Sequence, residues 1–418
     1  MRAPWPADPP PGPFRPAWWK SPLRGPWLTA FLGSILLVMV TVVAVTGFAS
    51  HAAYNPDLGM NQIVPRDQDL GFLLFDWPTT PSWLYAFNQG VHVTLGFVAV
   101  PFLLAKLWSV IPRLFAWPPV ASPAQGLERL SLALLVGSAL FLFATGIVNA
   151  QIFYPFKFNF VQGHYLAAIV FVASIILHVL LKLPTIRHAY RERGVLRPLR
   201  DDLASTRPEP YDPDGGLAPE NPDRPSLSRR GLVAFAGGAS ALTFVMLAGQ
   251  SIGGPLRKVA LLAPRRQEFP VNKTAASAGV TAEMTGSAWQ LELVAGDART
   301  QISRQDLLQM PQQRESLPLA CVEGWSTTQT WTGVRIADLA RAAGMADARE
   351  CFVESLQPRG ILREATLSAD QIADRRSLLA LTVGGEDLSL DHGYPARVIV
   401  PALPGVHNTK WVARMTFR

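Results

Sequence analysis

Three histidines lie within long apolar stretches of the chain, where an ionisable side chain is costly and is usually functional. His92 lies near the start of one stretch, and His164 and His178 lie fourteen residues apart in another. In a helix this spacing separates two imidazoles by about 21 Å on nearly the same face, so that one lies near each side of a bilayer. Because imidazole is a common axial ligand of haem iron, we predict a b-type haem in this part of the chain.

A bis-histidine haem needs a second ligand from a neighbouring helix. His92 and His164 come at matching depth if both of their stretches cross a membrane in the same direction, so we predict that they bind one outer haem together. The residue that matches His178 at the inner side is Lys106, which leaves a second haem at His178 open. Interhelical hydrogen bonding is the alternative role for each histidine.

A cysteine in the second half of the chain is the other candidate for redox chemistry. Cys321 lies in the apolar run Leu317–Trp325, where a cysteine taken alone is most often a buried, inert thiol. Its thiolate is nevertheless the soft ligand that a thiophilic transition metal prefers. The second cysteine, Cys351, has no motif around it. Because the two do not form a CxxC pair, neither a zinc site nor a disulfide framework is predicted.

Two segments of the second half resemble a known family. Cys321-Val322-Glu323-Gly324-Trp325-Ser326 resembles the molybdenum-ligand segment of the sulfite oxidase superfamily, and is most similar to the periplasmic methionine-sulfoxide reductase catalytic subunit. His392-Gly393-Tyr394-Pro395-Ala396-Arg397, followed by Asn408-Thr409-Lys410-Trp411, resembles the pterin-binding stretch of that superfamily with its HGxPxR and (S/N)xKW elements. The likeness extends over about 150 residues, a normal domain size.

The resemblance implies a Mo-molybdopterin cofactor, with Cys321 as its single protein ligand. It implies that Arg397 and Lys410 hold the anionic pterin phosphate by fixed positive charge, and that His392 bonds the pterin. The other residues that it implies near the cofactor are Ser355, Asn408, Thr409 and Asn272.

The residues around the two motifs bear on the substrate. Sulfite-oxidising members generally carry basic residues soon after the metal cysteine, whereas Glu323, Gly324 and Trp325 follow here, and the chain ends shortly after Trp411. Both points favour a reductase of a sulfoxide or N-oxide. Two alternatives stay open: a sulfite or related dehydrogenase that delivers electrons to quinone, and a non-catalytic sensor or binding module on a membrane anchor.

The elements that must position these groups follow from the hydropathy. The 418 residues are 49% hydrophobic, and apolar blocks occur near 27–48, 92–111, 130–150, 161–181 and 232–250. Each block is close to the roughly 20 residues that a helix needs to cross a bilayer. The net charge of +7 comes from basic residues beside these blocks, which argues against nucleic acid as a partner. We therefore predict five membrane helices.

The charges beside the spans indicate an orientation. Basic residues dominate before the first span and after the fourth, and acidic residues dominate the first loop, so we expect the N-terminus in the cytoplasm and the C-terminal domain outside. Ser228-Arg229-Arg230-Gly231-Leu232-Val233 resembles a twin-arginine export signal. Arg257, Lys258, Arg265 and Arg266 follow the fifth span on the side predicted to be external, against the rule. The expected location is the bacterial inner membrane, with the C-terminal domain periplasmic.

Together these patterns predict an α-helical membrane bundle followed by a mixed α+β domain of the sulfite oxidase type. The predicted segments are a disordered Pro-rich tail at 1–26, a four-helix cytochrome b-like domain at 27–188, a cytoplasmic linker at 189–228, a twin-arginine-like fifth helix at 229–252 and the molybdopterin domain at 265–418. The expected partners are membrane lipid, a quinone and a small-molecule substrate, in a monomer or loose oligomer.

Overall fold

The computed structural model describes residues 6, 8–54, 77–120, 122–155, 157–211, 216–360 and 363–418. It divides into two compact units. The first comprises Met1–Ala44, Leu95–Asn149 and Tyr154–Val245, and the second comprises Val45–Thr94, Ala150–Phe153 and Met246–Arg418. The acidic residues of the first loop, on which part of the orientation prediction depends, lie outside the described residues: Asp57, Asp67, Asp69 and Asp76.

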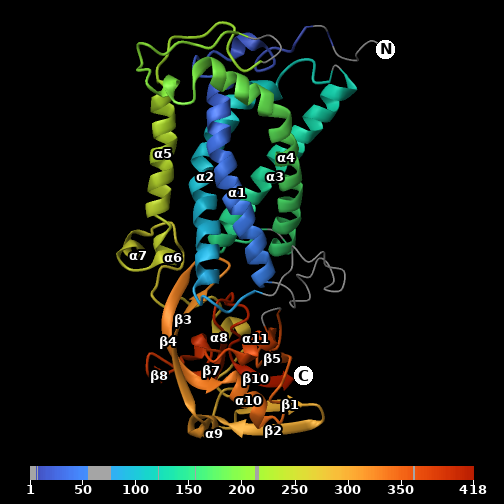
Figure 1. Ribbon diagram of the computed structural model, residues 1–418, viewed down its shortest axis with the longest axis vertical. Coiled ribbons are helices and arrows are strands. Elements are labelled where there is room, and N and C mark those ends of the chain that lie inside the picture. Colours follow the sequence, from blue (N-terminus) through green and yellow to red (C-terminus); the bar gives the residue numbers. More distant parts are fainter. Residues whose placement is uncertain are drawn as a thin grey trace. The chain divides into compact units, whose positions relative to one another are not determined.

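Five helices are long and apolar enough to cross a membrane, as predicted. They are α1 (Pro26–Tyr54), α2 (Leu84–Leu114), α3 (Pro123–Ala150), α4 (Phe160–Arg193) and the span Arg229–Ile252, which contains α5 (Arg229–Val245) and α6 (Gly249–Ile252). Figure 1 shows them as the long ribbons coloured from blue to yellow-green. Several helices extend past the apolar blocks that predicted them. Hydropathy detects the apolar part of a helix, whereas the backbone hydrogen bonds continue into its polar ends.

Large side chains of α1 form the core of the first unit with α2 and α5. Trp27, Leu28 and Leu32 are completely buried and pack with Phe102 of α2 and Ala236 of α5. This packing buries a continuous apolar stripe of α1, which stabilises the helix pair.

The described parts of the N-terminal tail and of the linker have fixed contacts, unlike the disorder expected of the tail. The Arg24 guanidinium lies over the Trp108 ring, 4.4 Å from its centroid, and the Asp223 amide donates to Lys20 O at 2.9 Å. Glu209 of the linker accepts from the Trp27 amide at 3.1 Å. Proline content predicted disorder, but Trp and Arg side chains bury enough surface to order these segments.

The first arginine of the twin-arginine-like motif is completely buried in the first unit. Arg229 donates to Arg207 O at 2.9 Å and to Pro22 O at 3.2 Å, and Glu209 lies 3.9 Å away, whereas Arg230 is exposed. In the folded protein Arg229 therefore joins the tail and the linker to the start of α5. Whether the motif directs export stays a prediction.

Two sheets and short helices form most of the second unit. One sheet has the order β2-β1-β10-β5-β6, in which β1 and β10 are parallel and the other pairs antiparallel. The other sheet has the order β3-β4-β7-β8, with β9 also paired to β7. The strands are β1 (Gln290–Ala295), β2 (Ala298–Ser303), β3 (Gln312–Ala320), β4 (Ser326–Arg335), β5 (Glu350–Ser355), β6 (Glu364–Ser368), β7 (Leu378–Val383), β8 (Glu386–Asp387), β9 (Arg397–Ile399) and β10 (Val412–Phe417). The short helices include α6 (Gly249–Ile252), α7 (Pro255–Val259), α8 (Ala275–Ala278), α9 (Arg304–Gln309), α10 (Ile336–Ala342) and α11 (Ala369–Ala373).

The central strand β7 is buried on both faces. Leu379 and Leu381 contribute to a core shared with β1, β5 and β10, whereas Leu378 and Ala380 contribute to a second apolar cluster that contains Cys321. A strand with both faces covered is a continuous apolar run, as the sequence Leu378-Leu379-Ala380-Leu381 is. The mixed α+β prediction for the C-terminal domain is confirmed by these elements.

Two adjacent leucines in α9 test this packing, because Leu307 is completely buried in the shared core and Leu308 is 40% exposed. We expect Leu307→Ala to lower the free energy of unfolding by about 2–5 kcal/mol, through lost burial and the cavity left behind. We expect Leu308→Ala to change it by less than about 0.5 kcal/mol. Urea unfolding of the detergent-purified chain, followed by tryptophan fluorescence, measures both. Equal effects would contradict the assigned packing.

Candidate functional site

The turn between β3 and β4 carries Cys321. The Cys321 amide donates to Trp325 O at 2.9 Å, and the Gly324 amide donates to Cys321 O at 3.0 Å, which closes the turn. Gly324 has φ +95°, and a Cβ there would lie 2.8 Å from the side chain of Val93, so only glycine fits this position. Cys321 is 8% exposed, and burial raises the pKa of its thiol. A bound metal ion would reverse this shift by favouring the thiolate.

A second group of side chains comes from the segment 389–410. The Ser389 hydroxyl lies 2.8 Å from His392 Nδ1, and the His392 ring stacks on Phe269 with 3.6 Å between centroids. Arg397, in β9, donates to His392 O at 3.1 Å. Lys410 Nζ donates to Asp391 O at 3.0 Å and also to Lys273 O. Main-chain carbonyls therefore hold both cationic side chains in place.

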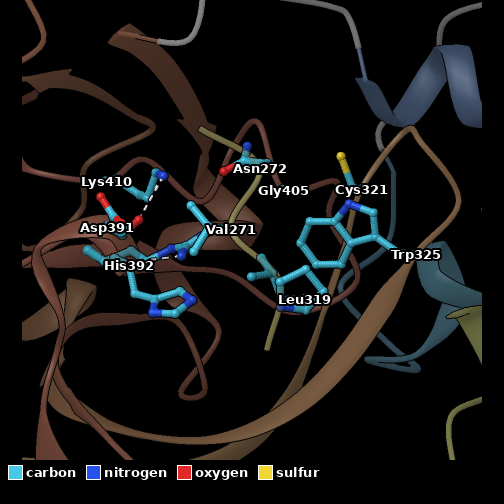
Figure 2. A pocket seen from close by; sticks show the side chains of 11 residues that line it. Val271, Asn272, Leu319, Cys321, Trp325, Asp391, His392, Gly405 and Lys410 are labelled. Atoms are coloured by element: carbon cyan, nitrogen blue, oxygen red, sulfur yellow. Dashed lines mark hydrogen bonds between the residues drawn. The ribbon is translucent and has the colours of Figure 1, made fainter. Parts of the chain in front are cut away.

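The cysteine turn and these cationic side chains line one pocket of the second unit. Figure 2 shows Cys321 beside Trp325 at one end and Lys410, Asp391 and His392 at the other, with Val271 between them. The lining residues are Pro270, Val271, Asn272, Leu319, Cys321, Trp325, Asp391, His392, Arg397, Gly405 and Lys410. The structure thus brings together five residues predicted from separate parts of the sequence: Asn272, Cys321, His392, Arg397 and Lys410.

The pocket holds buried positive charge. Arg397 is 4% exposed and Lys410 is 9% exposed, and within the described part of the chain neither forms an ion pair with a carboxylate. Burial lowers the pKa of Arg397 to about 9 and, with the charge of Arg397 as a second cause, lowers the pKa of Lys410 to about 6. Each of these side chains can carry its charge at neutral pH at low cost only with an anion nearby, and Lys410 otherwise loses its proton.

Three buried polar atoms of this region also need a partner. Across the described residues, His392 Nε2, Arg397 Nε and Thr409 Oγ1 have no hydrogen bond. Buried polar groups in native proteins are almost always satisfied, so these atoms indicate a polar ligand. An anionic, hydrogen-bonding cofactor such as the molybdopterin expected from the sequence fits both the charge and the two atoms that belong to pocket residues, His392 Nε2 and Arg397 Nε.

Three predicted residues do not line the pocket. Ser355 Oγ donates to Lys410 O at 2.7 Å, and Asn408 Oδ1 accepts from the Val400 amide at 2.7 Å. Thr409 O accepts from the Val398 amide at 2.9 Å, and its hydroxyl has no hydrogen bond among the described residues. Ser355 and Asn408 therefore fix the backbone around Lys410, which positions the cation indirectly.

An ion pair that sequence reasoning missed fastens the turn that carries Cys321. Glu323 Oε2 accepts from Arg265 Nε at 2.8 Å and from Trp325 Nε1 at 2.9 Å. Arg265 also donates to Val271 O, and to Asn272 O at 2.9 Å, which holds this part of the pocket wall. The signal in the sequence is the cluster of basic residues after the fifth span, whose charge alone indicates a topology conflict and not a partner. Asp391 was also missed, because its main-chain oxygen rather than its carboxylate contacts Lys410.

His164 in the first unit is held in one defined tautomer. Thr145 Oγ1 lies 2.9 Å from His164 Nδ1 and donates its own proton to Phe141 O at 2.7 Å. Because the hydroxyl proton is used there, Thr145 Oγ1 accepts from Nδ1–H, and the lone pair of the imidazole lies on Nε2. This is the arrangement that second-shell groups impose on histidines that ligate a metal.

His92 in the second unit has a similar neighbour on α1. Thr46 Oγ1 lies 3.5 Å from His92 Nδ1, and a Cβ on Gly47 would lie 2.8 Å from His92 Cε1. The same pair of residue types, Thr145-Gly146, contacts His164. A Thr-Gly pair on the preceding helix therefore lies against each predicted outer ligand, and the sequence contains this recurrence as Thr46-Gly47 and Thr145-Gly146.

The inner position is different. Lys106 Nζ donates to Thr29 O at 2.6 Å, so its ammonium group binds a carbonyl of α1. His178 is partly buried in α4. Lys106 thus has a structural partner of its own, and a second haem at His178 stays a prediction.

Comparison with known proteins identifies the second half. The family described as "Oxidoreductase molybdopterin binding domain" matches residues 278–418. Human mitochondrial sulfite oxidase is 33% identical over 116 residues, covering 26% of this chain and 21% of its own length. The uncharacterized oxidoreductase YuiH of Bacillus subtilis is 29% identical over 117 residues, covering 28% of this chain and 58% of its own length.

A plant enzyme is similar in the same region. Nitrate reductase [NAD(P)H] of Hordeum vulgare is 36% identical over 101 residues, covering 22% of this chain and 11% of its own length. The chain thus covers less than two thirds of each of these relatives. The match and the pocket agree with each other, and residues 278–418 form a molybdopterin-binding oxidoreductase domain of the sulfite oxidase type.

Proposed function

We propose that the chain is a membrane-bound, molybdopterin-dependent oxidoreductase that passes electrons from a quinol through a b-type haem to a molybdenum centre outside the bacterial inner membrane. The observation that supports this proposal best is the pocket that joins a buried thiol to two buried cations without carboxylate partners. Five helices of membrane-spanning length and the Thr-held histidines support the membrane and haem parts.

Different residues of the pocket would bind different parts of the cofactor. Cys321 would ligate the metal, which supplies two-electron oxygen-atom chemistry when it is bound. Arg397 and Lys410 would bind the anionic phosphate of the pterin, and His392 Nε2 and Arg397 Nε would complete their hydrogen bonding on the cofactor. Ser355 and Asn408 would hold the segment around Lys410 in register.

The wall near Cys321 favours a neutral substrate. Cys321 belongs to one apolar cluster with Leu319, Trp325 and Trp331. The charge of Arg265 is neutralised by Glu323, so it offers no binding site for a dianion. A sulfoxide or N-oxide, which is neutral overall and accepts two electrons and two protons as its oxygen leaves as water, fits this wall better than sulfite.

Sulfite oxidation is the second candidate, because a relative named sulfite oxidase aligns over the molybdopterin domain. The change in the oxidation state of the haem distinguishes substrate reduction from sulfite oxidation. We expect methionine sulfoxide or trimethylamine N-oxide to reoxidise the dithionite-reduced haem of the purified protein, and sulfite not to reduce the oxidised haem. Haem reduction by sulfite would select the second candidate, and a haem-containing preparation without molybdenum would overturn both.

The two buried cysteines provide a matched test of the metal ligand. We expect Cys321→Ser to lower turnover by at least about a hundredfold, because a weakly acidic hydroxyl replaces the soft thiolate. We expect Cys351→Ser, at a completely buried position in β5, to keep turnover within about threefold in the folded fraction. Turnover per folded protein and molybdenum per chain are the measurements. Equal losses of turnover in both variants would contradict the assignment.

The depressed pKa of Lys410 predicts a pH dependence of stability. Between about pH 6 and its ordinary value of 10.5, Lys410 is protonated in the unfolded chain but neutral in the cofactor-free fold. The unfolded state therefore binds more protons, and the free energy of unfolding should rise with pH by up to about 1.4 kcal/mol per unit. Lys410→Met should remove this slope.

Urea unfolding of cofactor-free protein from about pH 7 to about pH 9, for wild type and Lys410→Met, measures this difference while other titrating groups cancel. In the cofactor-loaded protein a bound phosphate should restore the charge of Lys410 and abolish the slope. Identical slopes in cofactor-free wild type and variant would count against a buried, neutral Lys410.

The contact between the Thr145 hydroxyl and His164 predicts that a substitution of Thr145 changes the reduction potential of the haem. Thr145→Val removes the acceptor for Nδ1–H, which makes the imidazole a weaker donor to iron and should raise the reduction potential by about 20–60 mV. Thr41→Val is the control, since Thr41 Oγ1 donates to Leu37 O of its own exposed helix turn. Spectroelectrochemical titration of both variants measures the shift, and an unchanged potential in Thr145→Val would remove His164 as the ligand.

A further inference from the structure

One side chain of α2 contacts the turn that carries Cys321. Gln89 Nε2 donates to Val322 O, the carbonyl of the residue after Cys321, at 2.7 Å. Gln89 is 5% exposed, and its Oε1 accepts from the Ser50 hydroxyl of α1 at 2.6 Å. Ser50 Oγ lies in turn 3.3 Å from Tyr85 Oη. Both ends of the amide are engaged, so its orientation is fixed by α1 on one side and by the turn on the other.

Gln89 and His92 lie on the same side of α2. They are three residues apart, the spacing at which side chains of a helix are neighbours. The hydrogen bond from Gln89 to Val322 O therefore links the backbone beside Cys321 to the turn of α2 that carries His92. All of these residues belong to the second unit.

Independent contacts hold the same turn at the same place. Gly324 has room for no side chain because Val93, the residue after His92, fills that space. The Ser251 hydroxyl donates to Gly324 O, and Ser326 Oγ donates to Ser251 O at 2.8 Å. The turn is thus held by Val93 of α2 and by Ser251 of α6 in addition to Gln89.

We propose that Gln89 positions the turn that carries Cys321 against α2. Its hydrogen bond to Val322 O is the path by which electrons pass between this turn and the haem at His92. This inference rests on the proposed function. Each reduction of a sulfoxide to a sulfide consumes two electrons and two protons and releases one water, so a one-electron haem must deliver electrons twice. Electron tunnelling weakens steeply across an unbonded gap, and the hydrogen bond from Gln89 to Val322 replaces such a gap.

The test uses the detergent-purified full chain with its cofactors and needs no substrate. A flash of light on deazaflavin injects one electron, and the later relaxation of the haem absorbance measures electron exchange between haem and molybdenum. Gln89→Leu keeps the size of the side chain but removes both hydrogen bonds. Gln151→Leu is the matched control, because Gln151 Nε2 also donates to a backbone carbonyl, Leu262 O at 2.8 Å, away from the turn that carries Cys321.

We expect the relaxation in Gln89→Leu to be slower by about tenfold or more, and that in Gln151→Leu to stay within about twofold of wild type. Ser50→Ala, which frees the amide of Gln89 without removing it, should be intermediate. Molybdenum content and haem potential should be unchanged in all three, which separates a lost electron path from a lost cofactor.

A relaxation in Gln89→Leu within about twofold of wild type, with both cofactors present, would overturn the inference and leave the proposed function intact. Equal slowing in Gln151→Leu, or slowing in Gln89→Leu that follows lost molybdenum or a shifted haem potential, would also overturn it. Wild-type protein that lacks haem or molybdenum would remove the proposed function itself, and that result comes from metal and pigment analysis rather than from the flash.

Discussion

The burial of Arg397 and Lys410 without carboxylate partners is the constraint that organises the second unit. Burying an unpaired cation is costly, and main-chain carbonyls compensate for only part of the lost hydration. The cation held by β9 and the cation held before β10 face a common pocket, and Ser355 and Asn408 contribute only to keeping the intervening backbone in place. Such an arrangement is stable when an anion occupies the pocket. The fold of residues 278–418 and its cofactor are therefore linked energetically, because whatever binds the folded state alone also stabilises it.

The ends of α1 and α2 within the second unit make this linkage relevant to electron transfer. His407, which follows the pocket residue Gly405, places Nε2 3.1 Å from Tyr54 O at the end of α1, while Gln89 of α2 contacts Val322. Gly405 itself donates from its amide to Ala320 O at 2.7 Å, immediately before Cys321. Both turns around the proposed metal position are thus fastened to helix ends. A displacement of either helix end would move the proposed metal ligand, so the precision of the site depends on these few polar contacts.

Sequence patterns predicted those features that depend on local chemistry. The five apolar helices and the mixed α+β character of the C-terminal domain follow from hydropathy and composition, and Cys321, His392, Arg397 and Lys410 follow from motifs that resemble a known family. The contacts that hold the site residues in place could not be predicted. They join residues far apart in sequence through main-chain carbonyls, which every residue has. Gln89, Lys410 and Arg265 each donate to a main-chain carbonyl, and the side chain of the accepting residue does not identify it as the acceptor. The described part of the tail shows the same limit, since its prolines predicted disorder whereas Arg24 contacts Trp108, a residue far away in sequence.

The basic residues after the fifth span show how structure changes the meaning of a charge pattern. Counting cations beside a membrane helix assumes that each charge is free to respond to the membrane potential and to lipid headgroups. Arg265 is paired with Glu323, and Arg257 Nη2 donates to Ser326 O at 2.6 Å, so two of the four cations have partners inside the second unit. These two arginines bond groups in and beside the turn that carries Cys321. Their charge therefore carries little information about the orientation of the chain in a membrane. Partners within the fold therefore account for two of these four cations, and the orientation of the molybdopterin domain stays a prediction.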